Sequence, residues 1–179
     1  MHQDLESVLF SEEEIRDKIA ELGEIITKDY AGKHPFILGL LKGCFIFMAD
    51  MCRQIKLPCD IDFMSVSSYG SGTSSTGAVK ITKDLSRDIE GRDVLILEDV
   101  LDSGNTLYYI KNYLAGRKPA SIKICTLLDK PFGRQSPVQA DYVGFTCPDG
   151  FVVGFGLDYA ERYRNLPYVG VLKPEIYSK

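Results

Sequence analysis

Hydrophobic residues recur along the chain with two different spacings, and these separate predicted helices from predicted strands. Apolar side chains at positions 15, 19, 22 and 26 lie three or four residues apart, as on one face of an α-helix. Ser11 and Glu14 form a capping-box pattern at the start of this stretch, and Gly32 is placed to end it. The pattern predicts an amphipathic helix between Ser11 and Gly32, and two further helices over residues 44–55 and 105–114.

Short apolar runs predict the strands. They cover residues 36–41, 58–68, 79–82, 94–97, 122–128 and 169–172, while residues 142–145 and 151–156 predict a hairpin or meander around the turn at 148–150. Two of the runs, 94–97 and 122–128, are typical of buried central strands in a parallel sheet. Since strands alternate with helices, the sequence predicts an α/β fold with a central, mostly parallel sheet and helices on both faces.

Residues 70–77 read GSGTSSTG and are the only low-complexity segment of the sequence. Small polar side chains bury too little apolar area to order such a segment. We therefore expect a mobile loop over about residues 69–78. The 179 residues of the chain otherwise fit one domain, residues 1–179.

Composition narrows the class of protein. The apolar fraction of 45% and the charged fraction of 26% are ordinary for soluble globular proteins. No apolar run reaches the roughly 18 residues that a membrane span requires. The first residues also lack the basic start and apolar stretch of a secretory signal. These features predict an intracellular, cytoplasmic protein with no membrane partner.

Cysteine usage and net charge argue against a disulfide-bonded or zinc-binding protein and against a nucleic-acid-binding protein. The five cysteines and two histidines include no C-x-x-C pair, which argues against structural disulfides and against a zinc site. The net charge is −4 and the pI is about 5.2. Nucleic acid is therefore not expected as a partner, because neutralising its phosphates requires a basic face.

Residues 94–106, which read VLILEDVLDSGNT, concentrate the polar chemistry of the chain. An apolar strand is expected to end in two adjacent carboxylates, Glu98 and Asp99, and a tight loop then enters the predicted helix. The loop consists of Asp102, Ser103, Gly104, Asn105 and Thr106. Glycine permits the turn, while hydroxyl groups and the amides of a helix N-terminus can surround one phosphate group.

The carboxylates would repel a phosphate unless they face something else. Sugar hydroxyls donate hydrogen bonds to carboxylates, and a hard divalent cation takes oxygen ligands and bridges to phosphate. The segment therefore predicts a phosphorylated sugar bound together with a metal. The alternative is an ordinary loop in which Asp102 and Ser103 cap a helix, which leaves Glu98 and Asp99 unexplained.

The same block closely resembles the phosphoribosyl pyrophosphate signature of type I phosphoribosyltransferases. Nearly the whole chain is similar to the hypoxanthine(-guanine) branch of that family. The similarity rests also on Leu41-Lys42-Gly43, Ser68-Tyr69-Gly70, Lys130 and residues 151–164. The resemblance implies transfer of a 5-phosphoribosyl group from phosphoribosyl pyrophosphate to a 6-oxopurine, with magnesium (Mg²⁺) as cofactor. It implies a purine salvage enzyme that makes IMP, and GMP if guanine is accepted.

The resemblance also assigns roles around the sugar. The loop from Asp102 to Thr106 would hold the 5′-phosphate, with Asp102 as the general base that takes the purine N7 proton. Glu98 and Asp99 would lie at the ribose hydroxyls and their magnesium, and Asp158 at a second magnesium.

Pyrophosphate would be bound by Arg164 and by Lys42-Gly43. The family places a cis peptide there, and the sequence leaves open whether the Leu41–Lys42 or the Lys42–Gly43 bond is cis. Without the resemblance, Gly43 would be taken as a plain turn.

For the purine, the resemblance implies that Lys130 donates to the 6-oxygen, so adenine is refused. Phe151 would stack on the base and Val152 would offer backbone groups to its far edge, within a purine-binding hood of about residues 150–179 that also contains Asp158. Ser68 and Tyr69 would lead into an active-site lid, for which the alternative is a surface loop without function. Without the resemblance, Phe151 would be taken as a core aromatic.

Other classes fit less well. A regulatory, nucleic-acid-binding protein on this fold would need a basic face or an added helix-turn-helix. A nicotinamide-binding oxidoreductase and a P-loop hydrolase both lack their glycine motifs here. Within the enzyme class, a relative that prefers guanine or xanthine stays open. Family members are homodimers or homotetramers, and the sequence does not choose between them.

Overall fold

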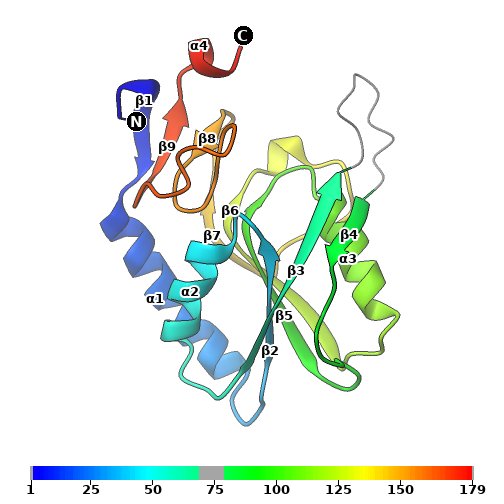
Figure 1. Ribbon diagram of the computed structural model, residues 1–179. Coiled ribbons are helices and arrows are strands. Elements are labelled where there is room, and N and C mark those ends of the chain that lie inside the picture. Colours follow the sequence, from blue (N-terminus) through cyan, green and yellow to red (C-terminus); the bar gives the residue numbers. More distant parts are fainter. Residues whose placement is uncertain (1, 69–78, 179) are drawn as a thin grey trace.

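The computed structural model of the protein describes residues 2–68 and 79–178 (Figure 1). The predicted mobile loop and Tyr69 lie outside these residues. In chain order the elements are η1 His2–Asp4, β1 Leu5–Phe10, α1 Glu12–Asp29, β2 Phe36–Leu41, α2 Phe45–Gln54, β3 Asp60–Ser68, β4 Val79–Lys83, β5 Asp93–Leu101, α3 Asn105–Ala115, β6 Ser121–Asp129, η2 Pro131–Gly133, β7 Tyr142–Thr146, β8 Val152–Val153, β9 Val169–Leu172 and α4 Pro174–Tyr177.

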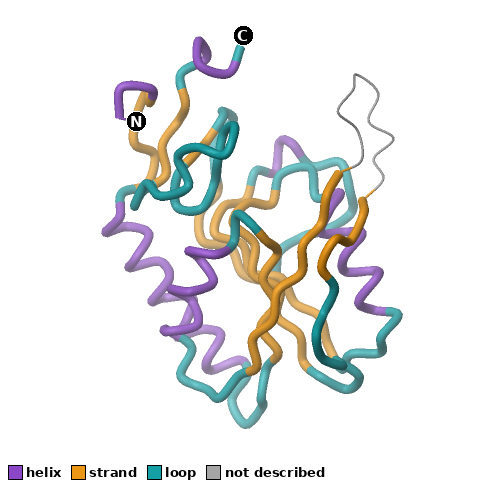
Figure 2. The backbone as a smooth tube through the Cα atoms, in the orientation of Figure 1, coloured by secondary structure: helices purple, strands orange, loops and turns teal. Residues whose placement is uncertain are grey.

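A six-stranded sheet forms the centre of the molecule, with strand order β4-β3-β2-β5-β6-β7 (Figure 2). Strands β3, β2, β5, β6 and β7 pair in parallel, and only β4 at one edge is antiparallel. The predicted α/β class with a mostly parallel sheet is confirmed. Because parallel strands all end at one edge of the sheet, this topology collects the loops after β2, β5 and β6 in one place.

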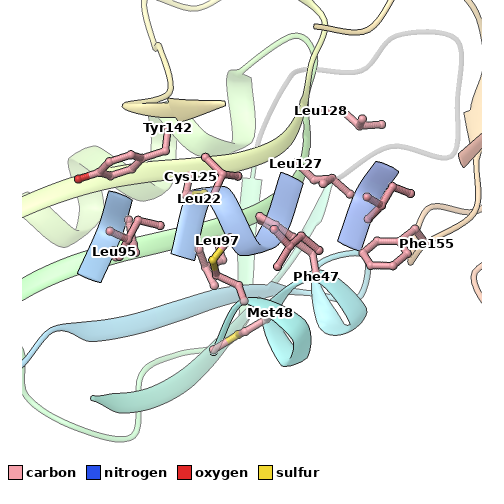
Figure 3. Close-up of a cluster of buried hydrophobic side chains, with 14 of the residues drawn as sticks. Leu22, Phe47, Met48, Leu95, Leu97, Cys125, Leu127, Leu128, Tyr142 and Phe155 are labelled. Carbon is pink, nitrogen blue, oxygen red and sulfur yellow. The ribbon is translucent and has the colours of Figure 1, made fainter. Parts of the chain in front are cut away.

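Helices cover both faces of this sheet, as expected. Helices α1 and α2 lie on one face and α3 on the other (Figure 1). Alternate side chains of β5 point to opposite faces: Leu95 and Leu97 pack in the cluster with α1 and α2, as Figure 3 shows, and Val94 and Ile96 pack beneath α3. All four are fully buried, which explains the uninterrupted apolar run in the sequence.

The first helix follows the sequence pattern closely. Ser11 caps α1, with its side chain accepting from the amide of Glu14 while the Glu14 carboxylate accepts from the amide of Ser11. The helix ends at Asp29, and Gly32 turns the chain at a φ of 76°. The predicted helix is therefore confirmed, with an end three residues before the glycine. Among the described helices, none is both long and apolar enough to cross a bilayer.

A second, three-stranded antiparallel sheet has the order β1-β9-β8 and lies beside the end of the large sheet where its parallel strands finish (Figure 1). Strand β1 was not predicted, since its apolar residues follow no strict alternation. Strand β1 is held by its pairing with β9, for example of Phe10 with Val169. This pairing joins segments that are far apart in the sequence.

The predicted hairpin of residues 142–145 and 151–156 is wrong. Strand β7 pairs in parallel with β6, while β8 pairs with β9 in the other sheet. The second strand is also shorter than predicted, because Gly154, Phe155 and Gly156 have φ angles of 101°, 50° and 102°, which no extended strand contains. The turn at residues 148–150 therefore links the two sheets.

Candidate active site

Three strand ends meet at one edge of the central sheet. Strand β2 ends at Leu41, β5 at Leu101 and β6 at Asp129, and the loop after β8 approaches the same edge. A Cβ atom on Gly156 would lie 2.0 Å from the carbonyl oxygen of Gly43, so only glycine permits this approach of the two loops. The contact places residues 154–164 against the ends of the parallel strands.

The acidic pair lies inside β5. The sequence predicted that the strand ends at Leu97, but β5 continues to Leu101 because Glu98 and Leu101 still pair with Thr126 and Asp129 of β6. Asp99 is buried next to Gly43, where an added Cβ would lie 1.8 Å from its Oδ2 atom. Glycine at position 43 is therefore required by this carboxylate, and position 43 is more than a plain turn.

Burial raises the pKa of Glu98 well above its ordinary value, and the neighbouring charge of Asp99 raises it further. The pKa of Asp99 is raised by burial as well, against an opposing effect of its hydrogen bonds and of Arg164. The Oε2 atom of Glu98 is buried and has no hydrogen-bond partner among the described residues. An unpartnered buried carboxylate oxygen is a vacant acceptor for a hydroxyl group or a cation.

This donor set fits magnesium. Across residues 2–68 and 79–178, no three His, Cys, Asp or Glu side chains gather closely enough to hold a metal ion alone. Mg²⁺ is commonly bound through one or two carboxylates together with substrate oxygens. Glu98 and Asp99 supply those two carboxylates.

Replacing Glu98 by glutamine is expected to stabilise the metal-free protein at pH 7 by about 1 to 3 kcal/mol, because the folded protein must otherwise either hold an unpartnered charge there or bind a proton that the unfolded chain does not hold at this pH. The folded state binds the Glu98 proton more tightly than the unfolded state does, so this group lowers stability as pH rises above the ordinary glutamate pKa. Urea unfolding in EDTA at several pH values measures the effect. The gain should grow from pH 4 to pH 7, and a gain independent of pH would contradict this electrostatic cause.

The loop after β5, predicted to surround a phosphate group, leads directly into α3. Gly104 takes a φ of 78° and is the N-cap of α3, and no side chain caps this helix. Asp102 and Ser103 therefore do not cap the helix, and that alternative is wrong. Ser103 Oγ accepts only a long hydrogen bond of 3.4 Å from the amide of Asn105. Thr106 lies in the first turn. Without a side-chain cap, the first-turn amides remain available to an anion.

Arg134 holds this loop and was not predicted from the sequence. Its guanidinium donates to the carbonyl oxygens of Asp102 at 2.8 Å, of Val138 at 2.7 Å and of Leu101 at 3.2 Å, and it also pairs with Asp129. It thereby ties the end of β5 to the end of β6. No local motif marks such a residue, because its acceptors are mainly backbone groups.

Asp102 and Lys130 face each other across the ends of β5 and β6. Lys130 Nζ lies 3.3 Å from Asp102 Oδ2 and donates to the carbonyl oxygen of Gly150 at 3.0 Å. Asp102 is half exposed, and both residues line a cavity of about 160 Å³ that also includes Cys147 and Asp149. The pair is therefore accessible to a small molecule.

Phe151 lies just before β8, with its ring partly exposed. Tyr177 stacks on it at 5.0 Å between centroids, and Tyr159 meets its edge at 5.5 Å. Val152 is paired with Val171 in the small sheet. The ring is thus a fixed aromatic platform, held by residues from the C-terminal helix and from the loop after β8.

The predicted pyrophosphate residues also come together. The peptide bond between Leu41 and Lys42 is cis, which settles the choice that the sequence left open. Arg164 Nη2 lies 2.9 Å from Asp158 Oδ1, and Lys42 Nζ lies 3.0 Å from Glu161 Oε2. Ser68 ends β3. Since Tyr69 is outside the described residues, the lid stays a prediction.

Comparisons with known proteins show the family to which the chain belongs. Residues 9–160 match the model of the phosphoribosyl transferase domain family. Hypoxanthine-guanine phosphoribosyltransferase of Bacillus subtilis is 57% identical over 178 residues, 99% of both chains. A crystal structure of a hypoxanthine phosphoribosyltransferase from Staphylococcus aureus superposes with a TM-score of 0.96 at 54% identity, covering 100% of this chain and 97% of that one.

Another relative is much longer. The bifunctional protein TilS/HprT of Listeria innocua is 57% identical over 179 residues. The alignment covers all of this chain but only 28% of that protein. The chain thus spans about a quarter of the length of this relative.

Proposed function

This chain belongs to the phosphoribosyltransferase family, among the hypoxanthine-guanine phosphoribosyltransferases, and from that premise we propose its reaction. It transfers the 5-phosphoribosyl group of phosphoribosyl pyrophosphate to hypoxanthine, and also to guanine, and releases pyrophosphate. The products are the nucleotides IMP and GMP, so the enzyme acts in purine salvage.

One observation carries the proposal. Near the carboxyl end of β5, Asp99 is buried and Glu98 keeps one buried oxygen without a hydrogen-bond partner among the described residues, and the loop that follows enters α3 without a side-chain N-cap. The amides suit a phosphate group, and the carboxylates suit the hydroxyls of the attached sugar. A phosphorylated sugar carries both kinds of group.

Asp102 serves as the general base. Its carboxylate is half exposed in the cavity beside Lys130, where it can accept the N7 proton of the purine as N9 attacks the sugar. Arg134 fixes the backbone carbonyl of Asp102 and so orients this side chain. Bound magnesium would neutralise charge on the leaving pyrophosphate.

Lys130 reads the purine by its 6-oxygen, since an ammonium group has donors only. Replacing Lys130 by alanine is expected to raise KM for hypoxanthine about tenfold or more, because one charged hydrogen bond is lost. KM for phosphoribosyl pyrophosphate should change much less. Steady-state kinetics with each substrate varied in turn measures this, and equal damage to both constants would contradict the assigned role.

We also propose that the protein is cytoplasmic and assembles as a homodimer or homotetramer. The lid at Ser68 and Tyr69 would exclude water from the activated sugar. The purine would stack on Phe151, with Val152 at its far edge and Asp158 near the second magnesium, in a hood of about residues 150–179 within a single domain.

The proposed reaction is tested by a spectrophotometric assay with hypoxanthine, guanine, xanthine or adenine and phosphoribosyl pyrophosphate. Turnover of hypoxanthine in magnesium, none in EDTA and none with adenine is the expected result. If only xanthine or only guanine is turned over, that purine is the substrate in place of hypoxanthine. No turnover of any purine would overturn the proposal.

A further inference from the structure

Glu161 lies between the two cations that are proposed to bind pyrophosphate. Its Oε2 atom is 3.0 Å from Lys42 Nζ, and its Oε1 atom is 3.6 Å from Arg164 Nη2. One carboxylate therefore bridges two positive groups from different loops. The Lys42 ammonium lowers the pKa of Glu161, so the carboxylate is ionised at neutral pH.

Arg164 is not saturated by this arrangement. It donates to the carbonyl oxygen of Gly156 at 2.8 Å and pairs with Asp158 at 2.9 Å, while its Nε atom is buried and has no hydrogen-bond partner among the described residues. The Arg164 side chain is 20% exposed. A guanidinium has five N–H donors, so it can still donate to a further anionic oxygen. The arginine is thus partly neutralised by acids of its own loop and still able to bind.

The backbone around Glu161 is held in an uncommon conformation. Ala160, Glu161 and Tyr163 have positive φ angles of 51°, 62° and 76°. Residues with a Cβ atom rarely take this conformation, and such residues cluster at functional sites. The Glu161 amide donates to Asp158 Oδ2 at 2.9 Å, which fixes the backbone that presents the carboxylate.

We propose that Glu161 is an internal competitor of pyrophosphate, whose carboxylate occupies the anion position between Lys42 and Arg164 until the substrate displaces it. The inference rests on the proposed function, and it adds a residue that sets the affinity for the diphosphate group. When pyrophosphate leaves, the carboxylate pairs with both cations again.

The competition is weak enough to be overcome. The side chains of Lys42 and Glu161 are 67% and 65% exposed, and exposed ion pairs are weak because water screens them. A magnesium-bound diphosphate offers several oxygen atoms to Lys42 and Arg164, whereas the Glu161 carboxylate offers two. Removing Glu161 should therefore change anion affinity by about two- to tenfold and should not abolish activity.

The test is Glu161→Gln, which keeps the shape of the side chain and removes its charge. In the complete enzyme with magnesium, KM for phosphoribosyl pyrophosphate and the inhibition constant of pyrophosphate are both expected to fall by the same two- to tenfold factor. KM for hypoxanthine should stay constant. Glu21→Gln is the matched control, because it removes the same charge from an exposed pair with Lys18 on α1.

A second variant separates competition from a general structural role. In a Lys42→Gln background, Glu161→Gln should give a smaller gain, since one of the two competed contacts is already gone. An unchanged or higher KM for phosphoribosyl pyrophosphate in Glu161→Gln, with active wild-type enzyme, would overturn this inference alone. Inactive wild-type enzyme would instead overturn the proposed function.

Discussion

Replacing Asp102 by asparagine should lower kcat for hypoxanthine by about 10² to 10⁴, the usual contribution of a well-placed general base. The amide has nearly the shape of the carboxylate, so it keeps the contact with Lys130. It also fits beside Gly133, where space is tight: an added Cβ on that glycine would lie 1.8 Å from Asp102 Oδ1. What is lost is the ability to accept the N7 proton. Rapid-mixing or steady-state assays at saturating substrates measure the change.

The control for this variant is Asp149→Asn, since Asp149 lines the same 160 Å³ cavity and has no part in the proposed proton transfer. Its kcat should remain close to that of the wild type. KM for phosphoribosyl pyrophosphate should change little in Asp102→Asn, because the backbone cradle is unaltered. An undiminished kcat in that variant would remove Asp102 from the role of base.

Replacing Gly156 by alanine should lower the free energy of unfolding by about 2 to 5 kcal/mol. The φ of 102° disfavours any residue with a Cβ, and this Cβ would meet the Gly43 carbonyl oxygen at 2.0 Å. The loops would have to separate, which moves Arg164 because Gly156 shares two hydrogen bonds with it. Urea unfolding and the KM for phosphoribosyl pyrophosphate measure the two effects.

Gly91→Ala separates the cost of the backbone conformation from the cost of the clash. Gly91 has a φ of 70°, and an added Cβ there would contact nothing within 4 Å. Its substitution should cost only about 1 to 2 kcal/mol and leave the kinetics unchanged. If both variants lose the same stability, the close approach of the two loops is less restrictive than the geometry indicates.

The sequence was most informative where one local cause determines the structure. The apolar run 94–97 indicated a central strand because both of its faces are buried, and the Ser11 to Glu14 pattern located the start of α1 because its hydrogen bonds are local. The end of β5 was misplaced because Glu98 and Asp99 interrupt the apolar run. Pairing with β6 carries the strand four residues further.

What could not be predicted depends on partners that are distant in the sequence. Strand β1 is fixed by pairing with β9, β7 pairs in parallel with β6 at the edge of the central sheet, and Arg134 binds carbonyl groups of several segments. Glu161 lies in the segment 158–164, which reads DYAERYR. In this segment the family resemblance assigned roles only to Asp158 and Arg164. Its closeness to Lys42 follows from the tertiary fold alone.

The pairing of β1 with β9 also bears on biosynthesis. Phe10 and its partner Val169 are joined across most of the sequence, so the small sheet cannot close until the last strand has emerged from the ribosome. The strands that carry the acidic pair and the cradle precede that point and pair with one another in the central sheet. Strands β1 and β8, which both pair with β9, therefore acquire their shared partner only after the strands of the central sheet have been made, so the part of the candidate site next to Phe151 is completed last.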